Sequence, residues 1–569
     1  MTDLKSIARK YAVKNAHDYG SARAEPIIGR LLAITKGADP AGARAAASDA
    51  VAWANALDRD SLEKEYSAYE KEFAAEQESK EAETAKPKLV LEGAAHGKVI
   101  TRISPEPSGY MHVGHVKQAL LSAESARLYS GKIYRYFDDT NPEKCKQEYV
   151  DAMKKDHEWL GMKFDREYYA SDQIGFIYEC AEKLIGLGKA YVCTCAREQM
   201  QQMRYDGISC EHRSQSVVVN KELFAKMLNG GFSDGEATLR FMGDMKAANT
   251  TLRDPVIARI VTAPHYKQGT KYRVWPLYDF NTPVLDSANG VTDIIRSKEY
   301  ELRDELDKRI LEALDMRVPR MHLEARLNVK GNETHKREIR KLIEDGKISG
   351  WDDPRLMTIM ALRRRGIRPE AIREFVMRFG FSKTDSEVPL EMLLAENKSI
   401  IDKSAKHLFF VPEPIMMEVH GWNGADAKLR LHPSADIGFR EYKTSGKFYI
   451  PKDDASLINI GGILRLKDLS DVKIIASSNT IIAERIEDGA KGRIVQWVDA
   501  NNPIKCEVVI PGEILDDRGE FNPDSIRTVH GVVEPYAASL KKGEIVQFER
   551  FGYCILDDKD SMRFIFTSK

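Results

Sequence analysis

The chain has 569 residues, of which 43% are hydrophobic and 30% are charged, and its formal net charge at pH 7 is −1. This length predicts several domains, and the composition excludes a largely disordered or fibrous protein. A net charge so close to zero argues against nucleic-acid binding over the whole surface, so any such binding would depend on local basic patches.

The cysteines and the apolar segments indicate the compartment. Seven cysteines stand at 145, 180, 193, 195, 210, 506 and 554. An odd and clustered set suits a reducing compartment better than a disulfide framework. No apolar run reaches the length of about 18 residues that spans a bilayer, and the start lacks the apolar core of a signal peptide. The sequence therefore predicts a cytoplasmic protein with no membrane partner.

The N-terminal 95 residues have the pattern of a small helical domain and a charged linker. Apolar residues recur at helical spacing within 3–57, beginning with Leu4, Ile7 and Tyr11. Residues 61–86 are dominated by Glu, Lys and Ala, which is typical of a solvated helix or a linker. Docking of other proteins is one interpretation of this domain, but its residues indicate only helices.

A strand, a loop and a helix are predicted in that order from Lys98. The β-branched run KVITRIS leads into the loop PEPSGYMHVGH at 105–115, and the helix that follows ends at Gly131. IYRYFD at 133–138 is the next predicted strand, and Asn141-Pro142 is the expected start of a helix through Trp159. This alternation predicts a doubly wound α/β domain with a parallel sheet.

The rest of the chain changes from helical to β texture. Residues 350–380 predict two helices, and arginines stand there at 363, 364, 365, 368, 373 and 378. Taken alone, these arginines indicate a solvated helix face. After residue 404, short alternating runs separated by Gly, Asp, Asn and Pro predict the strands of barrels or sandwiches.

The loop at 105–115 has the composition of a nucleotide site. Gly109 and Gly114 permit close backbone approach, and His112 and His115 could donate hydrogen bonds to phosphate near a helix N-terminus. Taken alone, the loop is as well explained by a tight turn with structural histidines.

Two short motifs offer a set of metal ligands. Cys193 and Cys195 form Cys-x-Cys, and Cys210 and His212 form Cys-x-His. Three thiolates and one imidazole suit tetrahedral Zn²⁺, although the spacing is tighter than in the commonest zinc knuckles. The alternative is a set of reduced structural cysteines beside a surface histidine. We expect a structural zinc site, which would have no open position for catalysis.

The loop belongs to a wider pattern that resembles one family. PEPSGYMHVGH resembles the HIGH signature of class I aminoacyl-tRNA synthetases, with residues 112–115 as its core. Further segments are similar to glutamyl- and glutaminyl-tRNA synthetases at 136–144, 252–260, 272–281, 290–296, 350–355, 492–498 and 546–557. The resemblance covers roughly residues 95–569, and the β-rich C-terminal region is similar to the archaeal and eukaryotic glutamyl branch or to the glutaminyl enzymes.

The resemblance implies a role for each domain. It implies a Rossmann-like catalytic domain at 96–190 and 271–320, a tRNA acceptor-binding insertion at 191–270, a helical stem-contact domain at 321–403, and anticodon-binding β-barrels at 404–569. The second family signature falls in VKGNETHKREIRKL at 329–342, where Lys336 and Arg337 match and His335 replaces the usual serine.

The resemblance also implies the site residues. It assigns ATP binding to Pro105, Gly109, His112, Gly114, His115 and Lys336, and catalysis to His112, His115, Lys336 and Arg337. Asp138 would bind the amino-acid ammonium group, and Tyr278, Arg102 and Arg296 would contact its side chain. Mg²⁺ would offset the charge of the two anionic substrates.

The implied reaction joins L-glutamate to tRNA(Glu) with ATP, through glutamyl-adenylate, and tRNA(Gln) is a further acceptor in some relatives. A buried arginine at 296 favours glutamate, because neutral glutamine would leave its charge unpaired. Two alternatives remain: a glutaminyl-tRNA synthetase and a non-catalytic tRNA-binding scaffold with the same fold.

Overall fold

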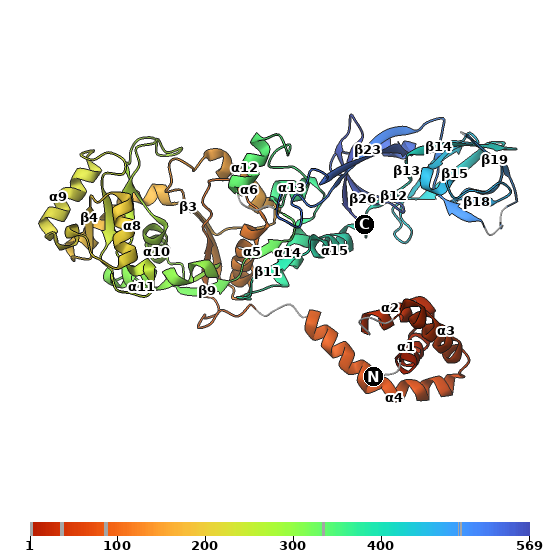
Figure 1. The fold of residues 1–569 in the computed structure, drawn as a ribbon, viewed down its shortest axis with the longest axis horizontal. Coiled ribbons are helices and arrows are strands. Elements are labelled where there is room, and N and C mark those ends of the chain that lie inside the picture. The colour runs from red at the N-terminus through yellow and green to blue at the C-terminus, as the bar shows by residue number, and fades with distance from the viewer. Residues whose placement is uncertain are drawn as a thin grey trace. The chain divides into compact units, whose positions relative to one another are not determined.

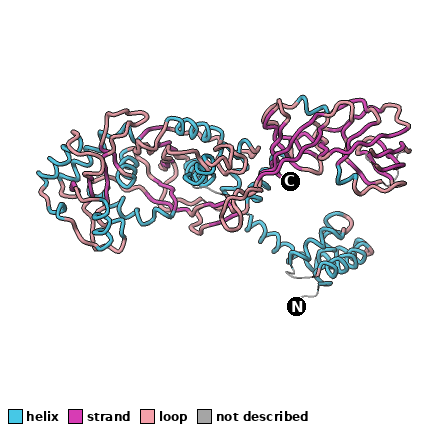
Figure 2. The backbone as a smooth tube through the Cα atoms, turned by 45° about the horizontal axis from the view of Figure 1, so that its top comes forward, coloured by secondary structure: helices cyan, strands magenta, loops and turns pink. Residues whose placement is uncertain are grey.

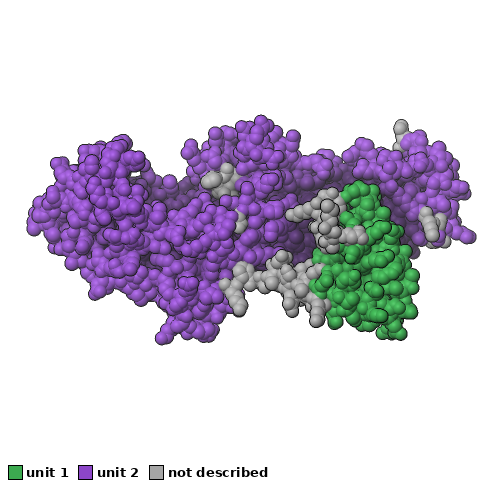
Figure 3. Space-filling model, turned by 60° about the horizontal axis from the view of Figure 1, so that its bottom comes forward, with its two compact units in different colours: residues 1–86 green, residues 87–569 purple. Residues whose placement is uncertain are grey.

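The computed structural model describes residues 4–34, 39–84, 89–332, 336–478, 480–487, 489 and 492–569. The chain divides into two compact units, residues 1–86 and 87–569 (Figure 3). His335 lies outside the described residues. Within the described ranges, no helix has both the length and the apolar character needed to cross a bilayer.

The first unit is helical. Helices α1 (Leu4–Tyr19), α2 (Ala24–Ile34) and α3 (Pro40–Asn55) pack around a core made largely of alanine, and α4 (Arg59–Thr84) follows. Small side chains let these helices approach closely. Asp39 caps α3, because its carboxylate accepts hydrogen bonds from the N–H groups of Ala41 and Gly42. Leu89 and Leu91 pack into the core of the second unit, so the boundary lies before them rather than at residue 95.

The second unit begins with the expected parallel sheet. Strands β1 (Ile100–Ile103), β2 (Lys132–Phe137) and β3 (Arg166–Tyr169) pair in parallel, and so do β8 (Asp293–Ser297) and β9 (Arg320–Glu324). The N–H of Thr292 donates to the carbonyl of Ile100, which places the start of β8 beside β1. Helices α5 (Val113–Leu128) and α6 (Gln147–Trp159) connect β1 to β2 and β2 to β3.

The prediction for the start of α6 was wrong. The helix begins at Gln147, and Lys146 is its N-cap without a side-chain hydrogen bond. Asn141-Pro142 forms a separate turn, in which the Asn141 carbonyl accepts from the N–H groups of Lys144 and Cys145. Asn–Pro favours a turn as readily as a helix start, and the turn keeps Asn141 in the pocket described below.

An antiparallel sheet and three helices interrupt the parallel one. Its strands are β4 (Ala190–Cys193), β5 (Thr238–Phe241), β6 (Val256–Ile260) and β7 (Val274–Pro276), in that order. The accompanying helices are α7 (Ile174–Gly186), α8 (Arg197–Asp206) and α9 (Val217–Leu228). The chain then returns through α10 (Tyr278–Ala288) to β8, and α11 (Asp304–Ala313) leads to β9.

A helical segment follows, with α12 (Lys336–Glu344), α13 (Ile359–Arg364), α14 (Pro369–Met377) and α15 (Leu390–Ile401). The solvated helix face predicted for the arginines was wrong for two of them. Arg365 is only 5% exposed, and burial lowers its pKa to about 10. Arg364 pairs with Asp557 of the C-terminal region. Because periodicity does not show what packs on a helix, the sequence alone could not show these contacts.

The C-terminal region contains two seven-stranded, barrel-like sheets (Figures 1 and 2) and a separate antiparallel pair, β15 (Ala425–Arg430) with β16 (Phe439–Thr444). One has the order β12-β25-β26-β27-β23-β24-β13, and the other has the order β21-β18-β19-β20-β14-β17-β22. Strands of the first are β12 (Lys406–Leu408), β13 (Phe410–Pro412), β23 (Ile504–Pro511), β24 (Ile526–Val533), β25 (Ile545–Phe548), β26 (Gly552–Asp558) and β27 (Arg563–Ser568). Strands of the second are β14 (Pro414–His420), β17 (Lys447–Pro451), β18 (Ile463–Leu466), β19 (Ser470–Ser477), β20 (Ile481–Arg485), β21 (Arg493–Val495) and β22 (Val498–Asp499).

Candidate active site

Two histidines stand at the N-terminus of α5. His112 is the N-cap residue, and its Nδ1 accepts the N–H of Gly114 at 3.1 Å. His115 Nδ1 accepts the N–H of His112 at 3.4 Å. A ring nitrogen that accepts a hydrogen bond carries no proton, so each neutral ring holds its proton on Nε2. Burial, reinforced by the neighbouring His112, lowers the pKa of His115 well below its usual value. Both rings therefore present an Nε2–H donor beside a helix N-terminus.

The glycines of this loop make room for specific side chains. A Cβ on Gly114 would lie 2.9 Å from Cε1 of His112, and a Cβ on Gly109 would lie 2.8 Å from Cδ of Lys336. Both distances are shorter than real carbon contacts. The glycines thus allow the imidazole of His112 and the stem of Lys336 to lie against the loop.

Lys336 joins the two signature segments in space. It is the first residue of α12, and its Nζ lies 3.4 Å from Oγ of Ser108 in the first loop. Burial lowers the pKa of Lys336. Arg337 points the other way, since its side chain is 95% exposed and contacts Glu338.

A pocket of about 420 Å³ gathers most of the predicted residues. Its lining includes the predicted Pro105, His115, Asp138, Tyr278, Arg296 and Lys336. It also includes residues that the sequence reasoning missed: Glu106, Thr140, Asn141, His157, Arg259, Tyr300 and Arg303. The predicted Arg102, Gly109, His112, Gly114 and Arg337 are not in this lining.

Asp138 directly follows β2, and its carboxylate lies in the wall of the pocket. Asn281 Nδ2 at 2.9 Å and Thr140 Oγ1 at 3.1 Å both donate to its Oδ1. Burial raises the pKa of Asp138 to about 6, and the bond from Asn281 opposes that rise. Asn281 stands three residues after Tyr278 on α10, and this helical spacing is the signal that could have identified it.

Arg102 lies behind the pocket rather than in its wall. Its side chain is fully buried and forms a bidentate pair with Asp286, with Nε and Nη2 each 3.0–3.1 Å from carboxylate oxygens. Its Nη1 has no hydrogen-bond partner among the described residues. Arg102 therefore stands behind the pocket as one half of a buried ion pair.

Arg296 has carboxylate partners of its own. Its Nη2 donates to Asp304 and, at 2.8 Å, to Asp307. Burial raises the pKa of Asp307 to about 7. The expectation that neutral glutamine would leave Arg296 unpaired was therefore too simple, because aspartates already offset its charge. Arg296 Nε has no partner among the described residues, so a donor remains.

The four predicted metal ligands come together between β4 and the short helix at Glu211–Ser214. Their ligand atoms all lie within 4.8 Å of one another. Cys195 Sγ lies 3.4 Å from Nδ1 of His212, and Cys193 Sγ lies 3.9 Å from Sγ of Cys210. The hydrogen bond from Cys193 lowers the pKa of Cys210 to about 4. A thiolate is the form that binds zinc.

The surroundings of this cluster fit a metal site. His212 Nε2 lies 2.9 Å from Oγ1 of Thr194, which leaves Nδ1 facing the cysteines. Arg240 Nη1 donates to the sulfurs of Cys193 and Cys210 at 3.7 and 3.5 Å. Such outer contacts orient ligands and stabilise thiolate charge. Three sulfurs and one imidazole nitrogen match the donor set of a closed structural zinc site.

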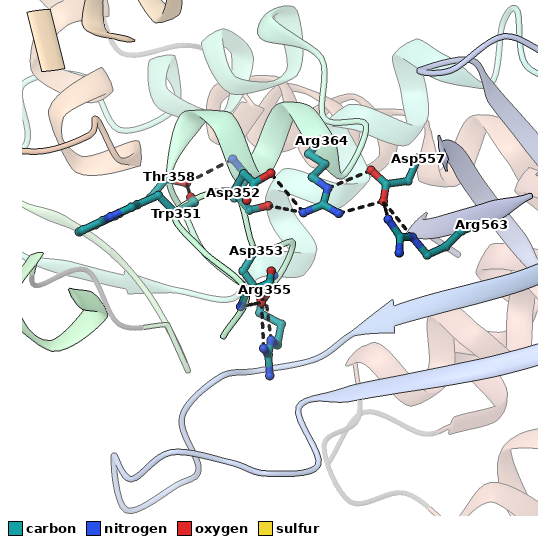
Figure 4. A network of polar contacts seen from close by, with 10 residues as sticks. Trp351, Asp352, Asp353, Arg355, Thr358, Arg364, Asp557 and Arg563 are labelled. Carbon is teal, nitrogen blue, oxygen red and sulfur yellow. Dashed lines mark hydrogen bonds and ion pairs between the residues drawn. The ribbon is translucent and has the colours of Figure 1, made fainter. Parts of the chain in front are cut away.

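A polar network joins residues 351–364 to the C-terminal strands β26 and β27 (Figure 4). Thr358 caps α13 and donates to the carbonyl of Trp351 at 2.6 Å. Arg364 pairs with Asp557, and the same carboxylate accepts from Arg563. Backbone bonds join this segment to the loop, because Val113 N–H donates to Met357 and Ile359 N–H donates to Met111.

Comparison with known proteins agrees with this architecture. Residues 98–403 match the family model of the class I (E and Q) tRNA synthetase catalytic domain. Residues 405–488 and 494–557 match models of the anti-codon binding domain of the same enzymes. The chain belongs to the class I tRNA synthetases of the E and Q type.

Curated relatives within this family match the chain over its length. The sequence is 40% identical to the glutamate–tRNA ligase of Nitrosopumilus maritimus, over 100% of both chains. It is 39% identical to the glutamate–tRNA ligase of Cenarchaeum symbiosum, over 97% of this chain and 98% of that one. It is 38% identical to that of Pyrococcus furiosus, over 100% of both.

Proposed function

We propose that this chain is a glutamate–tRNA ligase, which uses ATP to activate L-glutamate and transfers it to the terminal adenosine of tRNA(Glu). The full-length similarity to relatives with that name supports the proposal. The observation that carries it is the pocket itself, in which Asp138, Tyr278 and Arg296 meet His115 and Lys336. The first three suit an amino acid with an anionic side chain, and the last two suit phosphate.

Activation needs no nucleophile from the protein, because the glutamate α-carboxylate attacks the α-phosphate of ATP. Catalysis then consists of orienting two anions and stabilising the charge that develops on the phosphate. The Nε2–H groups of His112 and His115 and the ammonium group of Lys336 are the donors for this task. Mg²⁺, held mainly by the ATP phosphates, would offset the remaining negative charge.

Amino-acid recognition divides between the two ends of glutamate. The carboxylate of Asp138 pairs with the substrate ammonium group, and Arg296 with Tyr278 faces the side-chain carboxylate. Arg102 lies behind the pocket wall, where it is paired with Asp286. The preference for glutamate thus depends on the balance between these arginines and the aspartates that already neutralise them, rather than on one bare cation.

The remaining parts bind tRNA and zinc in this proposal. The antiparallel insertion holds the acceptor end, the helical segment contacts the stem, and the C-terminal sheets read the anticodon, as the family models of residues 405–557 suggest. Cys193, Cys195, Cys210 and His212 hold one structural Zn²⁺ that stabilises the insertion. The first helical unit remains a candidate for docking a protein partner.

Side-by-side aminoacylation tests the function. Purified tRNA(Glu) and tRNA(Gln) are incubated with ATP and labelled glutamate or glutamine. Glutamate transfer to tRNA(Glu) is expected, transfer to tRNA(Gln) would extend the substrate range, and transfer of glutamine alone would establish the glutaminyl alternative.

Variants of the phosphate donors test the scaffold alternative. His112→Ala and Lys336→Ala should slow glutamyl-adenylate formation by roughly 10²-fold or more, with tRNA affinity nearly unchanged, because both groups act on phosphate. Rapid-quench measurement of adenylate and filter binding of tRNA give the two values. If the native chain binds tRNA but forms no adenylate, it is a scaffold.

A further inference from the structure

Asp138 depends on a buried chain of hydrogen bonds that reaches back into the parallel sheet. We propose that Asn281, held in one orientation by Tyr136, is a positioning residue that keeps the Asp138 carboxylate turned toward the ammonium group of the amino acid. This inference rests on the proposed function and assigns specific residues to its amino-acid site.

The contacts on Asp138 are one-sided. Asn281 Nδ2 and Thr140 Oγ1 both donate to Oδ1, at 2.9 and 3.1 Å. Among the described residues, no hydrogen bond reaches Oδ2. Asp138 is 8% exposed and lines the pocket. One oxygen is thus fixed by the protein, and the other is left for a cation inside the pocket.

Tyr136 determines which way the Asn281 amide faces. The hydroxyl of Tyr136 donates to Asn281 Oδ1, so the opposite, donating end of the amide points at Asp138. The same NH₂ group lies 3.2 Å from Oγ1 of Thr140. Asn281 and Tyr136 are both fully buried. A flipped amide would place its oxygen against the carboxylate and leave the tyrosine hydroxyl without an acceptor, which is costly in a buried site.

The other groups around Asp138 oppose its negative charge. Glu106 lines the same pocket, Asp139 is the next residue in the chain, and the Asp286 carboxylate and the Cys145 thiol also interact with this region. The bond from Asn281 is the foremost contact that favours the carboxylate against burial. Without that bond, Asp138 would accept a proton at higher pH and would cease to attract an ammonium group.

The neighbouring strands β2 and β3 offer a matched control. The ring of Tyr168 stacks on that of Tyr136, with centroids 5.0 Å apart and planes 16° from parallel. The Tyr168 hydroxyl is buried and has no hydrogen-bond partner among the described residues. Removal of either hydroxyl therefore alters the same aromatic stack, but only Tyr136 belongs to the chain that ends on Asp138.

The test uses the full-length chain with Asn281→Ala, Tyr136→Phe and the control Tyr168→Phe. Initial aminoacylation rates give separate KM values for glutamate and ATP, and kcat/KM for glutamate is measured from pH 5.5 to 8.5. Inhibition by glutarate, which has both carboxylates but no ammonium group, is measured alongside. Circular dichroism and thermal unfolding monitor folding.

For Asn281→Ala we expect KM for glutamate to rise roughly 10- to 100-fold, as for loss of a hydrogen bond to a charged group. KM for ATP and inhibition by glutarate should change less than threefold, and the acidic limb of the pH profile should move to higher pH. Tyr136→Phe should act in the same direction but less strongly, and Tyr168→Phe should match the parent.

Other outcomes would overturn the inference. It fails if KM for glutamate and the pH limb are unchanged in folded Asn281→Ala, or if Tyr168→Phe equals Tyr136→Phe. It also fails if glutarate and glutamate weaken together, because that result indicates general damage to the pocket. A parent chain that does not use glutamate would instead refute the proposed function, so the two failures are distinguishable.

Discussion

Arg296 is the proposed partner of the substrate side chain, and it already pairs with two aspartates. Asp307 is 1% exposed, and Asp304 and Asp307 both contact the same Nη2. Removing the arginine should therefore have two effects: it removes the proposed partner of the substrate carboxylate, and it leaves a buried aspartate unpaired. These effects can be separated by experiment.

Arg296→Cys should lower kcat/KM for glutamate by roughly 10²- to 10⁴-fold and lower it much less for glutamine. The double variant Arg296→Cys/Asp307→Asn should recover thermal stability without recovering the preference for glutamate. Aminoacylation kinetics with both amino acids, together with melting curves, measure the two effects. An unchanged glutamate-to-glutamine ratio in the single variant would show that Arg296 does not discriminate.

The cluster of Cys193, Cys195, Cys210 and His212 is predicted to hold one zinc ion in a small element of the insertion. Native protein dialysed without chelator should contain one zinc per chain, measured by atomic emission. Cys210→Ser should lose the metal and expose residues 193–215 to proteolysis, because metal binding supplies the free energy that folds so small a site. Cys180→Ser, at a buried cysteine outside the cluster, is the control. Full metal content in Cys210→Ser would exclude this ligand set.

Helix α12 is positioned from the C-terminal region. Ile514, in the segment between β23 and β24, is fully buried and belongs to the same hydrophobic cluster as Ile339 and Leu342 of α12, and the N–H of Leu515 donates to the carbonyl of Gly331. The segment that carries Lys336 is thus supported by residues almost two hundred positions later. Because buried side chains are closely packed, we expect this contact to hold α12 in place.

Ile514→Ala should weaken this packing by about 2–4 kcal/mol, as for other buried Ile→Ala changes. Hydrogen exchange in α12 should accelerate, and KM for ATP should rise several-fold because Lys336 is less well fixed. Ile526→Ala, at a 40% exposed isoleucine where β24 begins, serves as the comparison. Unchanged exchange in α12 would mean that the contact is not needed to hold the helix.

Elements with strong local signals could be predicted from the sequence, and contacts between distant segments could not. The parallel strands, the first loop and the cysteine cluster follow from periodicity, glycines and spacing within short windows. Asn141-Pro142 misled the prediction because the same dipeptide starts turns and helices. The burial of Arg365 and the aspartates beside Arg296 depend on neighbours far along the chain. In the candidate site, family motifs named the residues, but only the structure placed Arg102 behind the wall.

Within the second unit, polar contacts connect residues that match the catalytic-domain model with the C-terminal strands, and we call these contacts the joint. Asp557 is 7% exposed, and its carboxylate accepts from Arg364 at 2.9 Å and from Arg563 at 2.9 Å. Arg355 adds a bond to Ser525 at 3.0 Å. The joint holds the two regions in a fixed relative position before tRNA binds to both, and this lowers the entropic cost of binding.

Asp557→Ala should therefore raise KM for tRNA several-fold while adenylate formation, which takes place in the pocket, changes little. Asp558→Ala is the neighbouring control, because the Asp558 carboxylate accepts its hydrogen bonds within its own turn, from Ser561 and from the N–H of Asp560. Steady-state kinetics with varied tRNA and with varied ATP give both values. Equal KM for tRNA in the two variants would show that the joint does not prepare the binding surface.

The order of the C-terminal strands has a consequence for synthesis on the ribosome. Strand β13 pairs with β24, and β12 pairs with β25, while the whole second sheet lies between them in the chain. During translation, β12 and β13 must therefore wait for more than a hundred residues, or roughly 5–25 s at usual elongation rates, before their partners emerge. The nested sheet can form during that delay. A nascent chain arrested after residue 533, with its last strands still in the exit tunnel, should be cleaved by protease near 405–412 and protected across 414–499.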